Sequence, residues 1–361
     1  MGNNLLFHRP IPRLIALKFA FLCRERRSSN GIRVAIVGAG ATGLSAAGYL
    51  VCRGYEVDLY DKLPLPGGLM TFAIPKHRIP LEEVMEGVED LRRNFGVEFN
   101  LSVKVSCGDG IDECDDLAKG RIDLQELSGD YKALLVATGT WKSRKLGLEG
   151  EDARNVYTAI DYLRKLHLRI LGLEGEGMRL GRVLVIGGGL SAIDAADESI
   201  NYGADEVLLV YRRTRKEAPA GEWEMRRLEE RGVKILELAS PKRFIVENGL
   251  VKFFELQRMM LSEPDETGRP RPVPIEGSEF SIEVDTVVKA IGEVPTPPIY
   301  RGCNLLNLSD GLKVDQDFRL IGNIFAAGDV VTGPSKIGRA VKQGLQAARK
   351  MDELISKGKI G

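Results

Sequence analysis

Several residue types are scarce in this chain of 361 residues, and each scarcity excludes a class of protein. Only five cysteines are present (Cys23, Cys52, Cys107, Cys114 and Cys303), and no two lie closer than Cys107 and Cys114. An odd, widely spaced set is unlike a disulfide framework, so we expect free thiols in a reducing, cytoplasmic compartment. Lys plus Arg number 51, as do Asp plus Glu, so no overall basic field attracts nucleic acid.

A long hydrophobic run is also missing. The apolar stretch at residues 14–23 is interrupted by Lys18, and it is far shorter than the roughly 20 residues of a membrane helix. Arg24-Glu25-Arg26-Arg27 follows in place of a small-residue cleavage site, which disfavours a secretory signal. Residues 1–30 carry six Lys or Arg and one acid. We expect a basic extension with a short amphipathic helix against the body or a partner, linked through residues 28–31.

The sequence does contain enough apolar residues, 43% of the chain, for a sizeable core, and it contains one structural unit twice. Each unit is predicted to be a buried strand, a glycine cluster, a helix, a second strand and, later, a strand that ends in small residues. In order, these segments are 32–37, 38–43, 44–54, 56–60 and 133–136, and then 182–186, 187–192, 190–202, 206–211 and 286–289. This pattern predicts an α/β protein with two Rossmann-like dinucleotide-binding domains.

The first glycine cluster has the Gly-x-Gly-x-x-Gly spacing in Gly38, Gly40 and Gly43. These glycines allow a tight turn, close backbone approach to a pyrophosphate, and close packing of helix on strand. Asp61 follows the next strand, where a carboxylate accepts hydrogen bonds from an adenosine ribose. We interpret this unit as a dinucleotide site, the alternative being a glycine-rich structural turn.

The second cluster, Gly187-Gly188-Gly189-Leu190-Ser191-Ala192, fits the variant that ends in alanine. The strand that follows it ends in Tyr211-Arg212-Arg213, with Arg215 and Lys216 close behind. Guanidinium groups bind a ribose 2′-phosphate, which a carboxylate would repel, so the pattern favours NADPH over NADH. A solvated charge run after a strand is the alternative.

An acidic first site and a basic second site together suggest FAD and NADPH, and therefore hydride transfer. A third landmark supports the flavin: a strand at 323–327 runs into Gly328-Asp329, a carboxylate suited to a ribityl chain. Residues 332–335 are predicted to cap a helix at 336–354, whose positive N-terminal end would face an anionic ligand.

The sequence resembles the FAD- and NADPH-binding half of the glutamate synthase small (beta) subunit family over about residues 31–354. The motifs that carry the resemblance are VAIVGAGATG, PGGL, AIPKHRIP, LLVATGT, VLVIGGG, VYRRT, AIG, AAGDVVTGP and SEPDETGRPRPVP at 262–274. That family belongs to the flavoproteins that include glutathione and thioredoxin reductases. The resemblance implies a glutathione-reductase-type fold in which the NADP domain is inserted into the FAD domain.

The resemblance also implies site residues. It places Gly38, Gly40, Gly43, Asp61, Gly68, Leu69, Arg78, Val105, Thr138, Gly139, Gly328, Asp329 and Ile337 at the FAD. It places Gly187, Gly188, Gly189, Leu190, Ser191, Arg212 and Arg213 at the NADPH. For Arg78, a surface-loop charge is an equally weighted alternative.

Domain boundaries follow from these motifs. We predict a basic extension at 1–30, the first part of the FAD domain at 31–145, the NADPH domain at 146–285, and the second part of the FAD domain at 286–361. Residues 262–274 are predicted to be an exposed loop between strands.

The expected activity is that of an NADPH-dependent flavoprotein oxidoreductase. Full-length family members hold iron–sulfur clusters in an N-terminal domain, but residues 1–30 contain only Cys23. We therefore expect no metal site, and electron transfer to an iron–sulfur partner, either a separate subunit or a ferredoxin. The basic extension and Lys142, Arg144 and Lys145 would attract an acidic ferredoxin, and a solvated surface is the alternative explanation of these charges. The cofactors carry the hydride step, so no side chain is predicted as its acid or base. Alternatives are a stand-alone NADPH oxidase or diaphorase, and a structural nucleotide-binding subunit.

Overall fold

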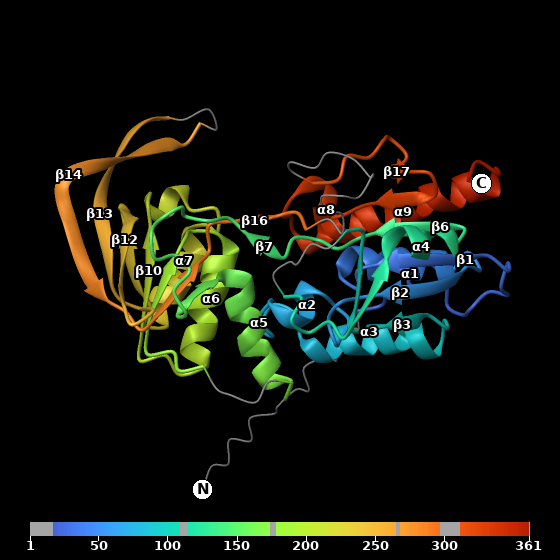
Figure 1. The fold of residues 1–361 in the computed structure, drawn as a ribbon, viewed down its shortest axis with the longest axis horizontal. Helices are drawn as coiled ribbons and strands as arrows, with labels where there is room; N and C mark the ends of the chain where they lie inside the picture. The colour runs from blue at the N-terminus through green and yellow to red at the C-terminus, as the bar shows by residue number, and fades with distance from the viewer. Residues whose placement is uncertain (1–16, 109–113, 174–177, 265–267, 297–310, 361) are drawn as a thin grey trace, which may run out of the picture.

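The computed structural model describes residues 17–108, 114–173, 178–264, 268–296 and 311–360. In Figure 1 the molecule is elongated, with one α/β unit at each end. The N-terminal and C-terminal parts of the chain lie in the same unit, and the middle of the chain forms the other. This arrangement agrees with a nucleotide-binding unit inserted into another.

The first unit is built on a sheet with the strand order β17-β18-β6-β1-β2-β3. All neighbours are parallel except β17 and β18. The strands are β1 (Arg33–Val37), β2 (Glu56–Tyr60), β3 (Glu98–Asn100), β6 (Ala133–Val136), β17 (Arg319–Ile321) and β18 (Ile324–Ala326). Near-continuous apolar strands are buried on both faces, as parallel sheets require.

Helices and a small second sheet complete this unit. They are α1 (Ala41–Val51), α2 (Leu69–Phe72), α3 (Leu81–Arg93), α4 (Leu124–Gly129), α8 (Asp329–Thr332), α9 (Ile337–Ser356), β4 (Val103–Ser106) and β5 (Gly120–Asp123). Helices α1 and α9 pack along each other, and small residues on α1 such as Ala46 and Ala47 are fully buried there. The C-terminal helix is therefore part of the core of the first unit.

The second unit repeats the arrangement with the strand order β11-β10-β9-β15-β8, all parallel. Its elements are β8 (Val156–Thr158), α5 (Ala159–Ile170), β9 (Arg182–Ile186), α6 (Leu190–Asn201), β10 (Glu206–Tyr211), η1 (Arg215–Glu217), α7 (Glu222–Glu230), β11 (Lys234–Glu237) and β15 (Thr286–Lys289). The two units are joined by a short antiparallel ribbon of β7 (Lys142–Ser143) and β16 (Glu293–Val294). The duplication predicted from the sequence is present in the fold.

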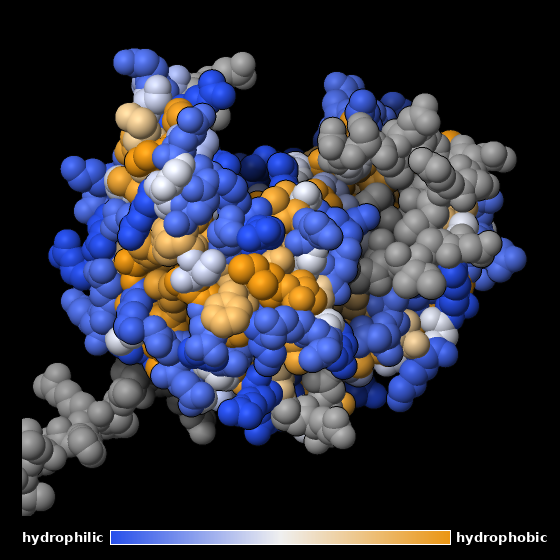
Figure 2. All heavy atoms as spheres, turned by 60° about the vertical axis from the view of Figure 1, so that its left-hand side comes forward, coloured by the Kyte–Doolittle hydropathy of each residue, from blue (hydrophilic) through white to orange (hydrophobic). Residues whose placement is uncertain are grey.

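A three-stranded antiparallel sheet extends from the second unit. It consists of β12 (Ala239–Glu247), β13 (Leu250–Pro264) and β14 (Pro270–Glu283). The prediction of an exposed loop over 262–274 was wrong for most of that segment, because β13 and β14 pair as far as Pro264 and Pro270. Proline is tolerated on β14 because β14 is an edge strand of this sheet. The hairpin curves away from the body in Figure 1 and stands beside a notch in Figure 2.

Residues 17–31, before β1, lie against α1 and α3 of the first unit, and we call this segment the strap. Phe19 and Ala20 are buried in it, and the structure shows turns there instead of the predicted amphipathic helix. A Cβ at Gly48 would lie 2.0 Å from the Phe19 carbonyl oxygen, and one at Gly87 would lie 1.9 Å from the Leu17 carbonyl oxygen. These glycines on α1 and α3 let the strap backbone lie directly on both helices.

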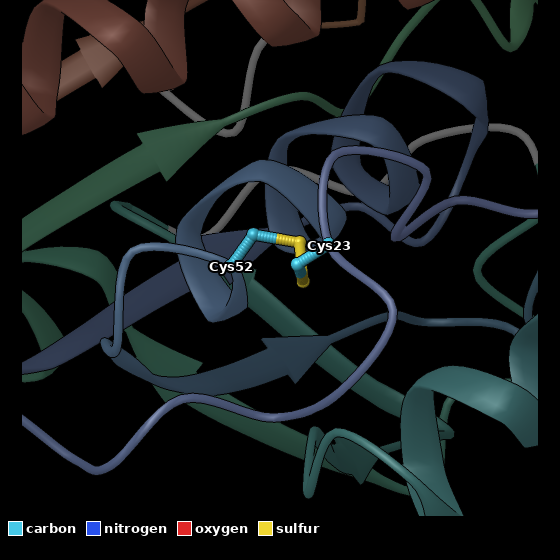
Figure 3. The surroundings of a disulfide bond; sticks show 2 residues. All are labelled: Cys23 and Cys52. Carbon is cyan, nitrogen blue, oxygen red and sulfur yellow. A yellow bond between two sulfur atoms is a disulfide. The ribbon is translucent and has the colours of Figure 1, made fainter.

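The prediction of free thiols was wrong for Cys23, Cys52 and Cys107 and is confirmed for Cys114. Cys23 of the strap forms a disulfide with Cys52 at the end of α1 (Figure 3). Cys107 is also disulfide-bonded, whereas Cys114 is a buried free thiol. Cys303 lies outside the described residues. Tertiary packing brings the Cα atoms of Cys23 and Cys52 to 5.5 Å, although they are 29 positions apart in the sequence. Spacing alone gave no sign of this proximity.

No helix in the described part of the chain is long and apolar enough to cross a membrane.

Candidate functional site

The first glycine turn lies where β1 ends against β6. Gly38 has φ = 111°, and a Cβ on it would lie 2.3 Å from the carbonyl oxygen of Ala137. A Cβ on Gly43 would lie 1.9 Å from the Gly38 carbonyl oxygen. Only glycine fits at either position, and the helix α1 therefore begins directly above the strand ends.

Two neighbouring cavities open at the carboxyl end of this sheet. The first is lined by Val37, Gly38, Tyr60, Asp61, Lys62, Val103, Lys104, Val105, Asp115, Thr138, Trp141 and Thr296. The second includes Gly38, Gly40, Thr42, Asp61, Gly67, Gly68, Leu69, Thr138, Gly139, Trp141, Asp329, Ser335 and Ile337. Most residues predicted at the FAD thus lie around one continuous edge of the sheet, where dinucleotides bind in this fold.

Asp61 connects the two cavities. Its carboxylate accepts hydrogen bonds from the backbone N–H of Ala39 at 2.6 Å and of Leu63 at 2.9 Å. Burial raises the pKa of Asp61, and the two backbone hydrogen bonds oppose that effect. The carboxylate is therefore fixed at the end of β2, facing the glycine turn.

Trp141 and Thr296 also line the first cavity, and sequence reasoning did not select them. The Thr138 hydroxyl donates to the Thr296 carbonyl oxygen at 2.8 Å, and the Trp141 N–H donates to the Thr296 hydroxyl at 2.7 Å. These bonds fasten the segment after β6 to the return strand from the second unit. The tryptophan two residues after Gly139 was the available signal.

Asp329 lies at the far side of the second cavity. Its carboxylate accepts hydrogen bonds from the hydroxyl of Ser335 at 2.5 Å and from its N–H at 3.2 Å. The cap predicted for α9 differs from the structure: Lys336 is the N-cap residue, without a side-chain capping bond, because Ser335 binds Asp329 instead. The beginning of α9 still borders the cavity through Ile337.

The second glycine turn repeats the geometry of the first. Gly187 has φ = 146°, and a Cβ on it would lie 2.2 Å from the carbonyl oxygen of Ala290 at the end of β15. A Cβ on Gly188 would lie 2.5 Å from the Tyr211 ring, whereas one on Gly189 would meet nothing within 4 Å. Gly187 and Gly188 are therefore in close contact with neighbouring residues, whereas Gly189 faces open space.

A cavity opens beside this glycine turn. It is lined by Arg144, Lys145, Leu146, Ile186, Gly187, Gly188, Gly189, Val210, Tyr211, Arg212, Arg213, Pro219, Ala239, Ser240, Pro241, Arg269, Ala290, Ile291 and Gly292. Leu190 and Ser191 are absent from that set and form the first turn of α6. Arg144 and Lys145, which we predicted to attract an acidic partner, border this cavity, and the Arg144 backbone N–H donates to the Gly292 carbonyl oxygen at 2.9 Å. Their role toward a partner stays a prediction.

The arginines after β10 differ in their surroundings. Arg212 is exposed in the cavity wall, whereas Arg213 is only 4% exposed and donates from Nε to the Pro270 carbonyl oxygen at 2.7 Å. Arg215 is paired with Glu229, at 2.8 and 2.9 Å, and with Glu237. Arg215 is one of the basic residues after β10 that suggested a phosphate site, and its charge is neutralised by these two carboxylates.

Arg78 lies in an ionic cluster between the two units, and it is absent from the lining of both cavities of the first unit. Its Nε and a terminal nitrogen bind Asp194 on α6 at 2.6 Å and Glu224 on α7 at 2.7 Å. Burial raises the pKa of Asp194 to about 6, an effect that Arg78 opposes. Sequence spacing did not reveal these pairs, which join residues more than 100 positions apart.

Two histidines belong to the same contact between units. His77 Nδ1 lies 3.6 Å from a carboxylate oxygen of the fully buried Asp197. His167 Nδ1 lies 3.0 Å from the carbonyl oxygen of Thr71 in α2. Leu69, a cavity residue, packs against the core of the second unit. The segment from α2 to Arg78 therefore connects the two cavities of the first unit with the second unit.

The residues present fit the two expected cofactors. A Cβ on Gly68, whose φ is 56°, would come within 2.9 Å of the Gly40 Cα atom, so bare backbone lines the first site from two segments. An acidic group terminates β2 and a basic group terminates β10, next to the two glycine turns. These are the features that distinguish a ribose with free hydroxyls from one with a 2′-phosphate.

Comparison with known proteins agrees with this geometry. The family model described as pyridine nucleotide-disulphide oxidoreductase matches residues 32–344. The NADP(+)-dependent formate dehydrogenase subunit beta of Moorella thermoacetica is 36% identical over 335 residues, which cover 91% of this chain and 45% of that protein. The NADPH-dependent glutamate synthase small chain of Escherichia coli (strain K12) is 32% identical, with coverages of 88% and 68%.

Solved structures share the fold at low sequence identity. FprA of Mycobacterium tuberculosis, in complex with NADPH, has a TM-score of 0.72 and 20% identity, covering 92% of this chain and 86% of FprA. A Lactococcus lactis thioredoxin reductase has a TM-score of 0.63 and 21% identity, with coverages of 90% and 99%.

The chain spans about half the length of the first curated relatives it matches. The match over most of the chain nevertheless defines its family. This chain belongs to the pyridine nucleotide-disulphide oxidoreductases, and within them to the relatives of glutamate synthase small chains.

Proposed function

We propose that this protein oxidises NADPH at the second unit, stores the electrons on FAD in the first unit, and passes them to a separate protein acceptor. The observation that carries the proposal is the contrast at equivalent strand ends. Asp61 follows β2 beside the first glycine turn, and Arg212 follows β10 beside the second. One site is suited to a ribose with free hydroxyls and the other to a phosphorylated ribose.

When bound, NADPH supplies a hydride and FAD accepts it, so the protein needs to bind and align. Gly38, Gly40 and Gly68 give the backbone access to a pyrophosphate, and Asp61 holds a ribose. Gly187 to Gly189 provide the corresponding surface in the second unit, with Arg212 toward the 2′-phosphate. Leu190 and Ser191 are assigned to the same site through the N-terminal turn of α6.

The remaining assignments around the flavin follow the same cavities. Val105, Thr138 and Leu69 contribute apolar and hydroxyl surface, and Gly139 the backbone turn after β6. Asp329 with Gly328 and Ile337, at the beginnings of α8 and α9, would hold the ribityl chain and the ring edge of the flavin. Arg78 is assigned to the contact between units, where it forms ion pairs with Asp194 and Glu224.

The acceptor that we propose is a separate iron–sulfur protein or ferredoxin. Support comes from relatives whose names mark them as subunits: a formate dehydrogenase subunit beta, an NADPH-Fe(3+) oxidoreductase subunit beta and glutamate synthase small chains. Their names describe assemblies in which this kind of chain is one component. The cytoplasmic location expected from the sequence stays a prediction.

Anaerobic reduction tests the central step. We expect purified, FAD-loaded protein to lose its visible flavin absorbance when NADPH is added, and NADH to act much more slowly. Absorbance that stays unchanged with both nucleotides would contradict the proposal and support a structural nucleotide-binding subunit.

The acceptor is tested by turnover after that reduction. We expect faster NADPH oxidation with an iron–sulfur ferredoxin than with dioxygen or a quinone. Faster turnover with dioxygen or the quinone would contradict the protein acceptor and indicate a stand-alone oxidase or diaphorase.

A further inference from the structure

The β13–β14 hairpin lies outside the parallel sheet of the second unit, yet it contributes to the nucleotide cavity. Arg269, the residue directly before β14, lines this cavity together with the second glycine turn and Arg212. The side chain of Arg269 is exposed, as is that of Arg212. Two guanidinium groups from distant parts of the sequence therefore border the same cavity.

Arg213 explains how the hairpin is held there. This side chain is nearly fully buried, and its Nε donates to the carbonyl oxygen of Pro270, the residue that follows Arg269. The bond connects the end of β10 to the first residue of β14. The two adjacent arginines after β10 both border the cavity, but Arg212 is exposed in its wall, whereas Arg213 is buried between strand and hairpin.

The position of Arg269 along the cavity indicates which part of the nucleotide it would contact. In a Rossmann unit the adenosine ribose lies at the end of the second strand, which here is β10. Arg212 and the Arg213–Pro270 bond lie at that end. Arg144, whose N–H is bonded to Gly292, borders the cavity beside the end of β15 instead. Arg269 is therefore on the ribose side of the cavity.

We propose that Arg269 determines nucleotide specificity by binding the 2′-phosphate of NADPH jointly with Arg212, and that Arg213 is a positioning residue that holds the hairpin over the cavity. The inference rests on the NADPH site of the proposed function and assigns the hairpin a part in it. A guanidinium forms paired, charge-assisted hydrogen bonds with a phosphate. A nucleotide without the 2′-phosphate gains nothing from Arg269.

The test uses two probes that lack the nicotinamide, so that binding is measured without turnover. Calorimetric titration of the FAD-loaded protein with adenosine 2′,5′-bisphosphate and with 5′-AMP isolates the 2′-phosphate. We expect R269A to weaken binding of the bisphosphate by about tenfold or more, the effect of losing a charged hydrogen bond, and to leave 5′-AMP unchanged. R269K retains part of the affinity because it keeps the charge.

Arg271 provides the matched control. It is exposed on β14, two residues further along, and does not line the cavity. R271A is expected to bind both probes like the unmodified protein. Thermal melting and FAD content of each variant establish that the fold is retained.

A double substitution tests the role of Arg213. If Arg213 acts through Arg269, R213A weakens bisphosphate binding, and R213A in the R269A background adds no further loss. Additive losses would overturn the positioning role.

The Arg212→Ala variant separates this inference from the function on which it rests. Loss of bisphosphate affinity in R212A together with full affinity in R269A overturns the role of Arg269 and leaves the NADPH site standing. Full affinity in both variants overturns the NADPH site as well. Equal losses of bisphosphate and 5′-AMP in R269A contradict recognition of the 2′-phosphate.

Discussion

Asp61 and Arg212 occupy equivalent positions in the two units, because each follows a tyrosine that ends the second strand. The surrounding glycine turns are nearly the same, with Gly38 packed on Ala137 and Gly187 packed on Ala290. The opposite charges of Asp61 and Arg212 therefore distinguish two strand ends that lie beside similar glycine turns.

We expect Asp61→Asn to weaken FAD binding about tenfold or more, because a charged hydrogen bond contributes about 1.5–3 kcal/mol. Fluorescence titration of the FAD-depleted protein with FAD measures the dissociation constant. Glu56→Gln is the control, since Glu56 lies at the other end of β2, where it accepts a hydrogen bond from the Ser29 hydroxyl. Unchanged FAD affinity in D61N would argue against the ribose contact.

Glycine substitutions separate packing from ligand access. We expect Gly43→Ala to lower the free energy of unfolding by about 1–3 kcal/mol or more, because its Cβ would meet the Gly38 carbonyl oxygen. Gly189→Ala meets no neighbour within 4 Å, so we expect it to leave stability unchanged and to weaken NADPH binding. Urea unfolding and NADPH titration measure the two effects. The reverse pattern would contradict this division of roles.

At the scale of elements, the strap adds a layer to the first unit that no Rossmann motif contains. Gly48 and Gly87 admit its backbone on α1 and α3, and the Cys23–Cys52 disulfide fastens its middle. The disulfide attaches the strap to the C-terminal end of α1, where Cys52 is the C-cap residue. The strap is therefore an integral part of this unit.

We expect Cys23→Ser to lower the free energy of unfolding by about 2–4 kcal/mol under oxidising conditions, because the cross-link restricts the unfolded chain. Urea unfolding measures this difference. A reductant is expected to remove the difference between the two proteins. Equal stabilities before reduction would show that packing alone holds the strap.

At the scale of the whole molecule, ionic contacts fix one unit against the other. Arg78 from the first unit binds Asp194 and Glu224 of the second, and its side chain is 25% exposed. The contact lies beside Leu69, which borders the second cavity and packs against the core of the second unit. A change in this contact would alter how the two nucleotide sites face each other.

We expect Arg78→Ala to lower the free energy of unfolding by about 2–4 kcal/mol, since it leaves two buried carboxylates without this partner. FAD affinity is expected to stay unchanged, because Arg78 is absent from the cavity lining. Urea unfolding and FAD titration measure both quantities. Lower FAD affinity at unchanged stability would indicate that Arg78 contributes to the flavin site.

The same contact predicts a pH dependence. Burial raises the pKa of Asp194 from 3.8 to about 6. Between these values the native protein binds a proton that the unfolded chain does not, so this group lowers stability as pH rises through the window. We expect Asp194→Asn to gain about 1–3 kcal/mol relative to the unmodified protein between pH 4 and pH 7.

Asp285 is the matched control for that experiment. Hydrogen bonds from Arg182 lower the pKa of Asp285 to about 2. Its contribution to stability is lost only below pH 4, as pH falls from 3.8 toward 2. Urea unfolding of Asp285→Asn is therefore expected to show the same difference from the unmodified protein at pH 4 and pH 7. A constant difference for D194N as well would refute the raised pKa.

The sequence by itself determined the duplicated strand, glycine turn and helix, because those features depend on local backbone geometry and on which residues are buried. β1, β2, β9 and β10 lie within one residue of their predicted bounds. The same local logic placed Asp61 and Arg212 at strand ends beside the turns. Neighbours along the chain are sufficient to specify these positions.

Only the tertiary structure decided the contacts between distant segments. The Cys23–Cys52 bond, the pairing of Arg78 with Asp194 and the approach of Arg269 to the nucleotide cavity all join residues from separate elements. Such contacts depend on how layers and units pack, and neither residue carries a sequence signal of its partner. The loop predicted at 262–274 was wrong for the same reason, since the proline-rich end of the β13–β14 hairpin is stabilised by cross-strand pairing and by Arg213.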